Sequence, residues 1–136
     1  MSNLFGEEHV RRYIETDGEE GYTWREGSSI LLLTTTGRKS GKEITMPLIF
    51  GEDGGSQVLV ASRGGAPEHP GWYLNLEANP EVGVQVKADT FRARARTAEG
   101  EERERLWKAM NEIWPHYDEY QTKTTRQIPV VVLDRI

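Results

Sequence analysis

Six consecutive residues, Gly37–Lys42, bring together three cations, one hydroxyl and two glycines. Glycine allows backbone N–H groups to converge on an anion without hindrance from a Cβ atom. Arg38 can bind a phosphate or carboxylate through two parallel hydrogen bonds, and Lys39 adds a point charge. A Walker A loop is excluded, because Lys42 precedes Glu43 instead of Ser or Thr. The segment is typical either of a site for a small anionic ligand or of a soluble, charged hairpin turn.

A second basic loop, Ser62–Gly65, follows a strand predicted over Gln57–Ser62. We expect this strand to lie beside the hairpin that carries Gly37–Lys42, so that both loops face one ligand. The alternative is a glycine turn in which Arg63 is solvated. Two basic loops at adjacent strand ends favour the shared anion site. A local basic cluster on a protein of net charge −5 suits a small anion better than a polymer.

Aromatic side chains recur in two segments that are predicted to be helical. Trp72 and Tyr73 lie early in the first segment, where Asn75 either bonds locally or contacts a ligand. Tyr117 and Tyr120, in the second, are three residues apart and therefore share a helix face. A phenol has a pKa of about 10 and is protonated at neutral pH, so it can donate a hydrogen bond or a proton to a substrate oxygen. The alternative for both segments is packing in the core.

The composition excludes several classes of protein. The 136 residues contain no cysteine, which rules out disulfides, thiolate zinc sites and cysteine nucleophiles. No histidine is spaced from carboxylates as in a metal site, so we expect no metal. The negative charge argues against binding of nucleic acid, which needs a positive face. The polar segment Met1–Glu20 has no apolar run like a signal peptide or a membrane span, so a cytoplasmic protein is expected.

Hydrophobic periodicity predicts an α+β or barrel architecture of about six mainly antiparallel strands with flanking helices. A closed or a split barrel fits, because the last strand can pair with an early one and hide an edge. The predicted strands are Ser29–Thr36, Glu43–Phe50, Gln57–Ser62, Val82–Lys87, Thr90–Thr97 and Gln127–Leu133. The predicted helices are Leu4–Thr16, Pro70–Ala78, Glu99–Ile113 and Pro115–Lys123. Pro47 cannot donate to a ladder and marks an edge or a bulge. The length fits one domain, with an N-terminal helix and loop over residues 1–28 and a barrel over residues 29–136.

Four segments resemble the deazaflavin-dependent nitroreductase family, whose members use reduced coenzyme F420 and come from mycobacteria and related actinobacteria. They are Leu31–Gly41, Val60–Gly65, His69–Pro80 and Gln127–Val132. Their order and spacing are specific, and the resemblance covers residues 29–133. It implies a split β-barrel like that of FMN-binding proteins.

The resemblance also implies roles for individual residues. The implied cofactor contacts are Arg38, Lys39, Ser40, Gly41, Lys42, Met46, Pro47, Leu48, Ala61, Ser62, Arg63, Gly64, Gly65, Trp72, Tyr73 and Asn75. Tyr117 matches a tyrosine that binds or protonates substrate, in a pocket shared with Trp114 and Tyr120. Two positions depart from the family: Ile44 replaces an arginine near the cofactor, and Trp114 replaces a tyrosine, so reduction of nitroimidazoles does not follow.

The expected activity is hydride transfer from F420H2 to a quinone, an enone or a nitro compound. FMN in the same fold, a non-catalytic deazaflavin-binding module and a barrel whose basic turn is only a surface are the alternatives. Split barrels of this kind often pair, so a homodimer is open, as is contact of the N-terminal segment with a membrane.

Overall fold

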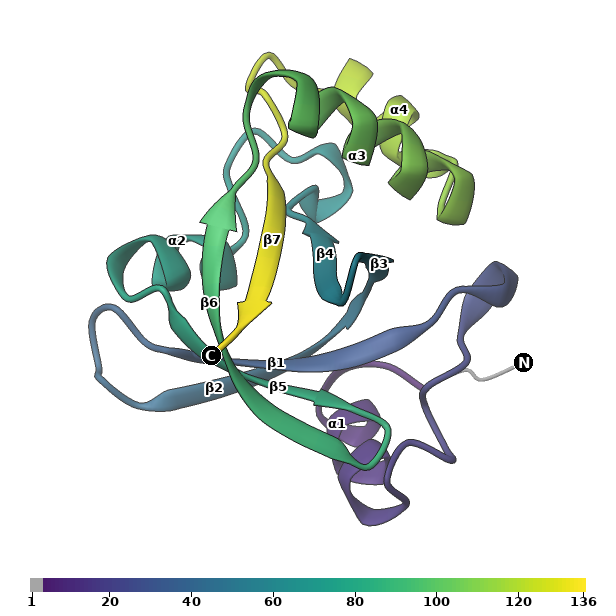
Figure 1. The fold of residues 1–136 in the computed structure, drawn as a ribbon, viewed down its shortest axis with the longest axis vertical. Coiled ribbons are helices and arrows are strands. Elements are labelled where there is room, and N and C mark those ends of the chain that lie inside the picture. The colour runs from purple at the N-terminus through teal and green to yellow at the C-terminus, as the bar shows by residue number, and fades with distance from the viewer. Residues whose placement is uncertain (1–3) are drawn as a thin grey trace.

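The computed structural model describes residues 4–136, and its strands form one antiparallel sheet of order β2-β1-β5-β6-β7-β4-β3 (Figure 1). The strands are β1 (Ile30–Thr36), β2 (Glu43–Ile49), β3 (Gly51–Asp53), β4 (Ser56–Val60), β5 (Glu81–Val86), β6 (Asp89–Thr97) and β7 (Val130–Arg135). The helices are α1 (Gly6–Glu15), α2 (Gly71–Ala78), α3 (Gly100–Ile113) and α4 (His116–Thr122). None of these helices is long and apolar enough to cross a membrane.

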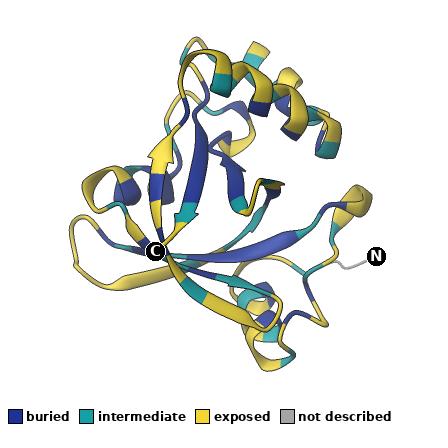
Figure 2. Ribbon diagram, in the orientation of Figure 1, coloured by how far each residue is buried: buried dark blue, intermediate teal, exposed yellow. Residues whose placement is uncertain are grey.

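The apolar run of β1 explains why this strand is central. Successive side chains of a strand point to opposite faces, and both faces of β1 are covered. Leu31 and Leu33 belong to the main core, whereas Ile30 and Leu32 pack with Tyr13 of α1. In Figure 2, β1 and β7 are accordingly dark blue, while the turn between β1 and β2 is yellow.

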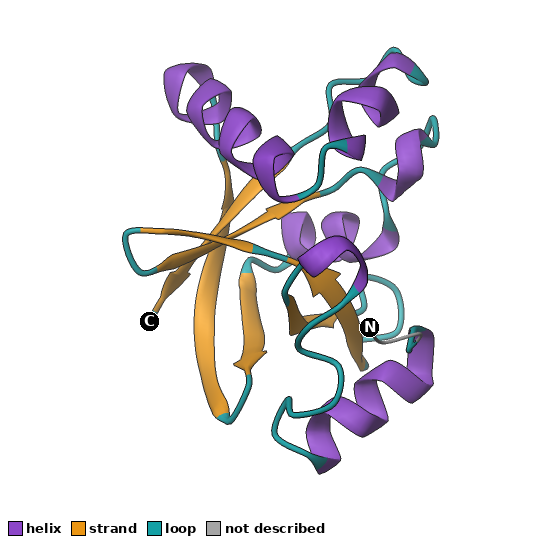
Figure 3. Ribbon diagram, turned by 90° about the vertical axis from the view of Figure 1, so that its right-hand side faces the viewer, coloured by secondary structure: helices purple, strands orange, loops and turns teal. Residues whose placement is uncertain are grey.

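The sheet curls because β6 belongs to both of its halves. Its first residues pair with β5 and its last with β7, and the strands of the two halves cross steeply (Figure 3). The single residue Phe50 then carries the chain from β2 at one edge to β3 at the other. The result is a half-barrel in which β2 and β4 come into contact although they do not pair.

Three helices position the residues of the pocket described below. The Tyr13 hydroxyl of α1 donates to the carbonyl oxygen of Ile30 (3.0 Å) and accepts from the amide of Lys87 (2.7 Å), which holds α1 against the sheet. Helix α2 packs on β1, and α4 packs on the Ser62–Gly65 loop. A Cβ at Gly65 would lie 2.6 Å from the carbonyl oxygen of Tyr120, so only glycine permits this close approach.

The α+β split barrel is confirmed, with two corrections. The described residues form seven strands instead of six, because Gly54 and Gly55 make a two-residue turn at positive φ that allows the short strand β3 to pair with β4. The strand before the Ser62–Gly65 loop pairs with β7 and β3, not with the β1–β2 hairpin, and reaches that hairpin only through the curl of the sheet. Pro47 lies on edge strand β2, as predicted.

Candidate functional site

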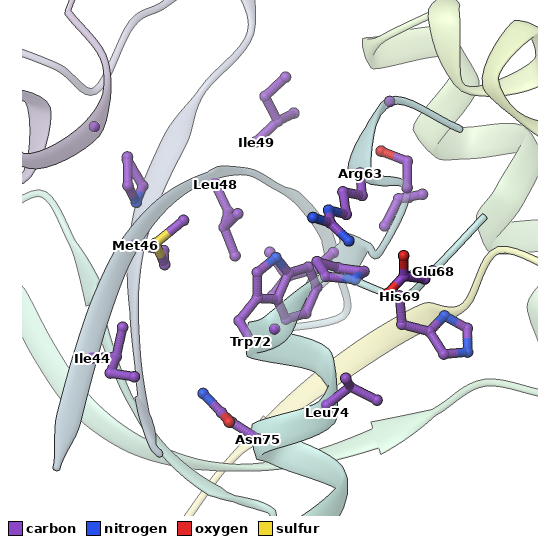
Figure 4. Close-up of a pocket in the computed structure, with 18 of the residues that line it drawn as sticks. Ile44, Met46, Leu48, Ile49, Arg63, Glu68, His69, Trp72, Leu74 and Asn75 are labelled. Carbon is purple, nitrogen blue, oxygen red and sulfur yellow. The ribbon is translucent and has the colours of Figure 1, made fainter. Parts of the chain in front are cut away.

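A pocket of about 970 Å³ opens between the two halves of the barrel (Figure 4). Its lining comes from the N-terminal segment, from β1, β2 and the turn between them, from β4 and the loop that follows, from α2, and from the region of α4. The lining residues are Phe5, Gly6, His9, Trp24, Ile30, Gly37, Arg38, Lys39, Ser40, Ile44, Met46, Pro47, Leu48, Ile49, Leu59, Val60, Ser62, Arg63, Gly64, Glu68, His69, Pro70, Gly71, Trp72, Leu74, Asn75, Trp114, Tyr117 and Tyr120.

The Gly37–Lys42 turn is held in shape by its own polar groups. The amide of Gly37 donates to the carbonyl oxygen of Lys42 (2.7 Å), and the amide of Gly41 donates to the carbonyl oxygen of Gly37 (2.8 Å). The Ser40 hydroxyl accepts from the amide of Lys42 at 3.1 Å. The side chains of Arg38 and Lys39 stay exposed at the pocket, where they are available to an anion.

Asn75 ties this turn to α2. Its Oδ1 accepts from the backbone amide of Arg38 (3.2 Å) and from Nη1 of the same residue (2.8 Å). Its Nδ2 donates to the hydroxyl of Thr35 at 3.2 Å. The buried amide therefore orients both the backbone and the guanidinium of Arg38, while Asn75 also lines the pocket.

The Ser62–Gly65 loop presents backbone N–H groups. Ser62 has right-handed helical angles (φ −79°, ψ −39°), and Arg63 follows with a φ of 47°. Such a right-handed and left-handed pair turns consecutive amides to one side and makes a concavity for anions. Among residues 4–136, none accepts a hydrogen bond from the amides of Ser62, Arg63 or Gly64, and all three residues line the pocket.

An apolar wall faces these polar loops. Met46 and Leu48 of β2 line the pocket opposite Trp72 of α2 (Figure 4), and Pro47 also belongs to the lining. Met46 is 40% exposed, so the wall is open to a ligand. Such a surface suits the face of a planar ring.

Aromatic residues near α4 complete the lining. Tyr117 is buried, and its hydroxyl bonds to no residue that the structure describes. Burial, and next the repulsion from Tyr120, raise the pKa of Tyr117, so its phenol stays protonated. The indole Nε1 of Trp114 donates to the hydroxyl of Tyr120 at 3.4 Å. Tyr117 thus contributes a protonated hydroxyl, without a partner among the described residues, to the mainly aromatic part of the lining.

Five predicted site residues lie outside the lining. They are Gly41, Lys42, Ala61, Gly65 and Tyr73. Gly41 and Lys42 shape the turn, Ala61 is core, and Gly65 faces α4. Tyr73 is corrected to a core residue, because its hydroxyl pairs with that of Thr97 (2.8 Å) and its ring packs beneath α2. The other predicted residues share the one pocket.

The N-terminal segment contributes side chains to the pocket that the sequence did not predict. Phe5, His9 and Trp24 line the pocket, and Trp24 stacks on Trp114 with ring centroids 5.9 Å apart. His9 is buried and bonds the carbonyl oxygen of Gly21 at 2.8 Å. No local motif marks these side chains, because the partners that place them are far away in the sequence.

A family model described as F420H(2)-dependent quinone reductase matches residues 5–135. The chain belongs to this family. An F420H(2)-dependent quinone reductase of Mycobacterium tuberculosis strain H37Rv is 40% identical over 130 residues, which cover 93% of this chain and 87% of that protein. Membership of the F420H(2)-dependent quinone reductase family confirms the expected deazaflavin-dependent oxidoreductase class and favours F420 over FMN.

Two solved structures are similar to this chain. The structure of an F420-H2 dependent reductase, FDR-A, is 51% identical with a TM-score of 0.72, and the match covers 77% of this chain and 93% of that chain. A structure described as a domain-swapped dimer is 46% identical with a TM-score of 0.75, and the match covers 93% of this chain and 95% of that one.

Proposed function

We propose that this protein passes a hydride from reduced coenzyme F420 to a quinone bound in the pocket described above. The observation that carries the proposal is that one pocket joins exposed cations, open backbone amides, an apolar wall and a buried phenol. Membership of the F420H(2)-dependent quinone reductase family supports both the hydride donor and the class of acceptor.

The residues present fit the deazaflavin. The cofactor has a planar ring and a tail that carries phosphate and carboxylates. Arg38, Lys39 and Arg63 would hold the tail with the open amides of the Ser62–Gly65 loop, and Met46 with Leu48 would lie along the ring. A volume of about 970 Å³ lies near the upper end of the range for small-molecule sites.

When bound, the reduced deazaflavin supplies the hydride. The protein supplies position and electrostatics. The aromatic part of the pocket, including Trp24 and Trp114, would stack a flat acceptor and exclude water from it. Tyr117 would donate a hydrogen bond or a proton from its hydroxyl to the acceptor oxygen on which negative charge develops.

The acceptor range and the environment of the protein follow as narrower proposals. Ile44 lines the pocket and is 42% exposed, so an apolar side chain stands at the position of the expected arginine. We expect quinones to be reduced faster than nitroimidazoles, with enones in between.

The exposed Phe5 beside the pocket supports weak contact with a membrane, and the dimeric relative supports a homodimer.

The test measures binding and turnover separately. Purified protein is titrated into F420 and, in parallel, into FMN, with ligand fluorescence as the signal. F420H2 is then offered with menadione, cyclohexenone or a nitroimidazole, and its oxidation is followed by absorbance. We expect F420 to bind, FMN not to bind, and menadione to be reduced.

A matched pair of lysine variants controls this test. Lys39→Ala should weaken F420 binding, whereas Lys108→Ala, on α3 outside the pocket, should not. Binding without turnover of any acceptor would identify a sequestering module, and binding of FMN alone would identify a flavin enzyme. Equal F420 affinity in Lys39→Ala and wild type would show that the Gly37–Lys42 turn is only a charged surface and does not bind the cofactor.

A further inference from the structure

Arg126 makes four contacts with the segment that contains the Ser62–Gly65 loop, although it does not line the pocket. Its Nε donates to the carbonyl oxygen of Ala66 (2.9 Å), and its Nη2 donates to that of Ser62 (2.8 Å). Its Nη1 donates to the carbonyl oxygen of Ala61 (3.2 Å) and meets Nδ1 of His69 at 3.0 Å. One guanidinium therefore gathers three backbone carbonyls and one imidazole from the connection between β4 and α2.

These contacts divide the loop into two faces. The carbonyls of Ala61, Ser62 and Ala66 turn toward Arg126, while the amides of Ser62, Arg63 and Gly64 have no described acceptor. A carbonyl dipole left on the pocket side would repel an anion, and an N–H group attracts it. The contacts with Arg126 thus explain why the Ser62–Gly65 loop can present its backbone N–H groups to the pocket while the nearby carbonyl oxygens turn away from it.

The contacts depend on the shape of the guanidinium. Arginine offers five N–H donors in a rigid plane, whereas lysine offers one flexible ammonium. Since a guanidinium cannot accept a hydrogen bond, Nδ1 of His69 must be the acceptor, so this contact is made by the neutral ring with its proton on Nε2. Arg126 is itself held by Gln121, whose Nε2 donates to the carbonyl oxygen of Arg126 at 2.7 Å and whose Oε1 accepts from the amide of Ile128 at 3.0 Å.

Arg126 also lies close enough to Arg63 for the two charges to interact. Burial, and next the charge on Arg63, lower the pKa of Arg126. A second cation behind the loop adds to the positive field that faces the pocket. The side chain of Arg63 itself points into the pocket (Figure 4).

We propose that Arg126 is a positioning residue: it orients the Ser62–Gly65 loop so that three backbone amides face the anionic group of the bound ligand. The inference rests on the proposed function for the identity of that ligand. The orientation of the loop is a property of the free protein and is tested independently.

The experiment compares Arg126→Lys with Arg96→Lys. Arg96 likewise loses a fork of hydrogen bonds, to Glu102 and Asp134, while its charge is kept outside the pocket. F420 affinity is measured by fluorescence, and the free proteins are compared by amide chemical shifts and by thermal unfolding. We expect Arg126→Lys to raise the Kd for F420 about tenfold or more, as loss of one or two hydrogen bonds to a charged group would do, and to shift the amide signals of residues 62–66. Arg96→Lys should do neither, and the KM for menadione should be unchanged in both.

Each outcome decides the inference. A folded Arg126→Lys with wild-type affinity and wild-type loop signals overturns it, as does an equal loss of affinity in both variants. If Arg126→Lys does not fold, Arg126→Gln takes its place, because its shorter amide still donates one hydrogen bond. If wild-type protein binds no F420, the proposed function fails, and the amide signals of residues 62–66 in the free variants alone decide the role of Arg126.

Discussion

The Oδ1 atom of Asn75 accepts two hydrogen bonds from Arg38, one from its backbone amide at 3.2 Å and one from its guanidinium at 2.8 Å. A buried side chain on α2 thereby fixes the cation that leads the Gly37–Lys42 turn. The end of β1 next to the Gly37–Lys42 turn and the middle of α2 are therefore linked through Asn75.

Asn75→Ala should weaken F420 binding about tenfold, because Arg38 loses the partner that orients it, and an acceptor at Thr35 and donors at Arg38 are left unpaired. The Kd from fluorescence titration measures the effect. Asn79→Ala is the control, since Asn79 follows the C-terminal end of α2 and, among residues 4–136, its side chain bonds only the amide of Glu81 (3.3 Å). Equal affinities for the two variants would contradict the role given to Asn75.

Arg63→Gln should raise the Kd for F420 and reduce its dependence on salt. An exposed cation that meets an anionic tail gains affinity from charge, and salt screens that charge within about 10 Å at 0.1 M. The slope of log Kd against log salt concentration should be smaller for Arg63→Gln than for wild type. Arg11→Gln, on the outer side of α1, should leave the slope unchanged, and an unaltered slope for Arg63→Gln would place the tail elsewhere.

Tyr117→Phe should lower kcat about 10²-fold with menadione while leaving the Kd for F420 unchanged, because it removes the donor at the acceptor oxygen. Tyr73→Phe is a matched control that removes a hydroxyl bonded to Thr97 in the core. Tyr73→Phe should lower the free energy of unfolding by about 1 kcal/mol and leave kcat unchanged. Full activity of Tyr117→Phe with every acceptor would remove the donor role.

Trp24→Leu should raise the KM for flat acceptors by about three- to tenfold, the effect of losing one aromatic pair worth about 0.5–1.5 kcal/mol. The loss should fall on the acceptor and spare the Kd for F420, because Trp24 stacks on Trp114 and not on the basic loops. Trp107→Leu serves as control, since Trp107 bonds Asp118 (2.7 Å) outside the pocket lining. A change in F420 affinity alone would assign Trp24 to the cofactor instead.

Alkaline pH should lower the free energy of unfolding through Tyr117. Its pKa is raised in the folded state, so the unfolded phenol, with a pKa of about 10, ionises first. The contribution is therefore complete below about pH 10 and is lost above it. Denaturant unfolding at a series of pH values should show that the free energy of unfolding falls above pH 10, and that it falls less steeply in Tyr117→Phe. Part of the fall should remain in this variant, because burial also raises the pKa of Tyr13 and Tyr73.

Local sequence patterns were enough to predict six of the seven strands of the described residues, the four helices and the two basic loops. The alternation in β6 and the apolar run in β1 depend on neighbouring residues, and glycine with proline marks the turns. The short strand β3 was missed because three residues beside a glycine turn carry no period of their own. The order of strands was also beyond reach, since it depends on the bend of β6.

The part of the site that escaped prediction is held by contacts between distant residues. Trp72 and Tyr73 are adjacent, yet a helix turns one toward the pocket and the other toward Thr97. Arg126 reads as an ordinary charged residue, and only its distances to the carbonyls of Ala61, Ser62 and Ala66 show what it does. Sequence can supply the chemistry of such side chains but not their direction.

The one-residue link at Phe50 has a consequence for how this scaffold can change. Phe50 alone joins edge strand β2 to edge strand β3, so the distance between the two edges of the sheet is limited by the length of a single residue. A residue inserted next to Phe50 would move strands β2 and β3 apart. A residue inserted between Gly54 and Gly55 would only lengthen the turn between β3 and β4. We therefore expect changes in the ligands that the pocket accepts to arise from substitutions of its lining side chains, while the backbone of the sheet stays the same.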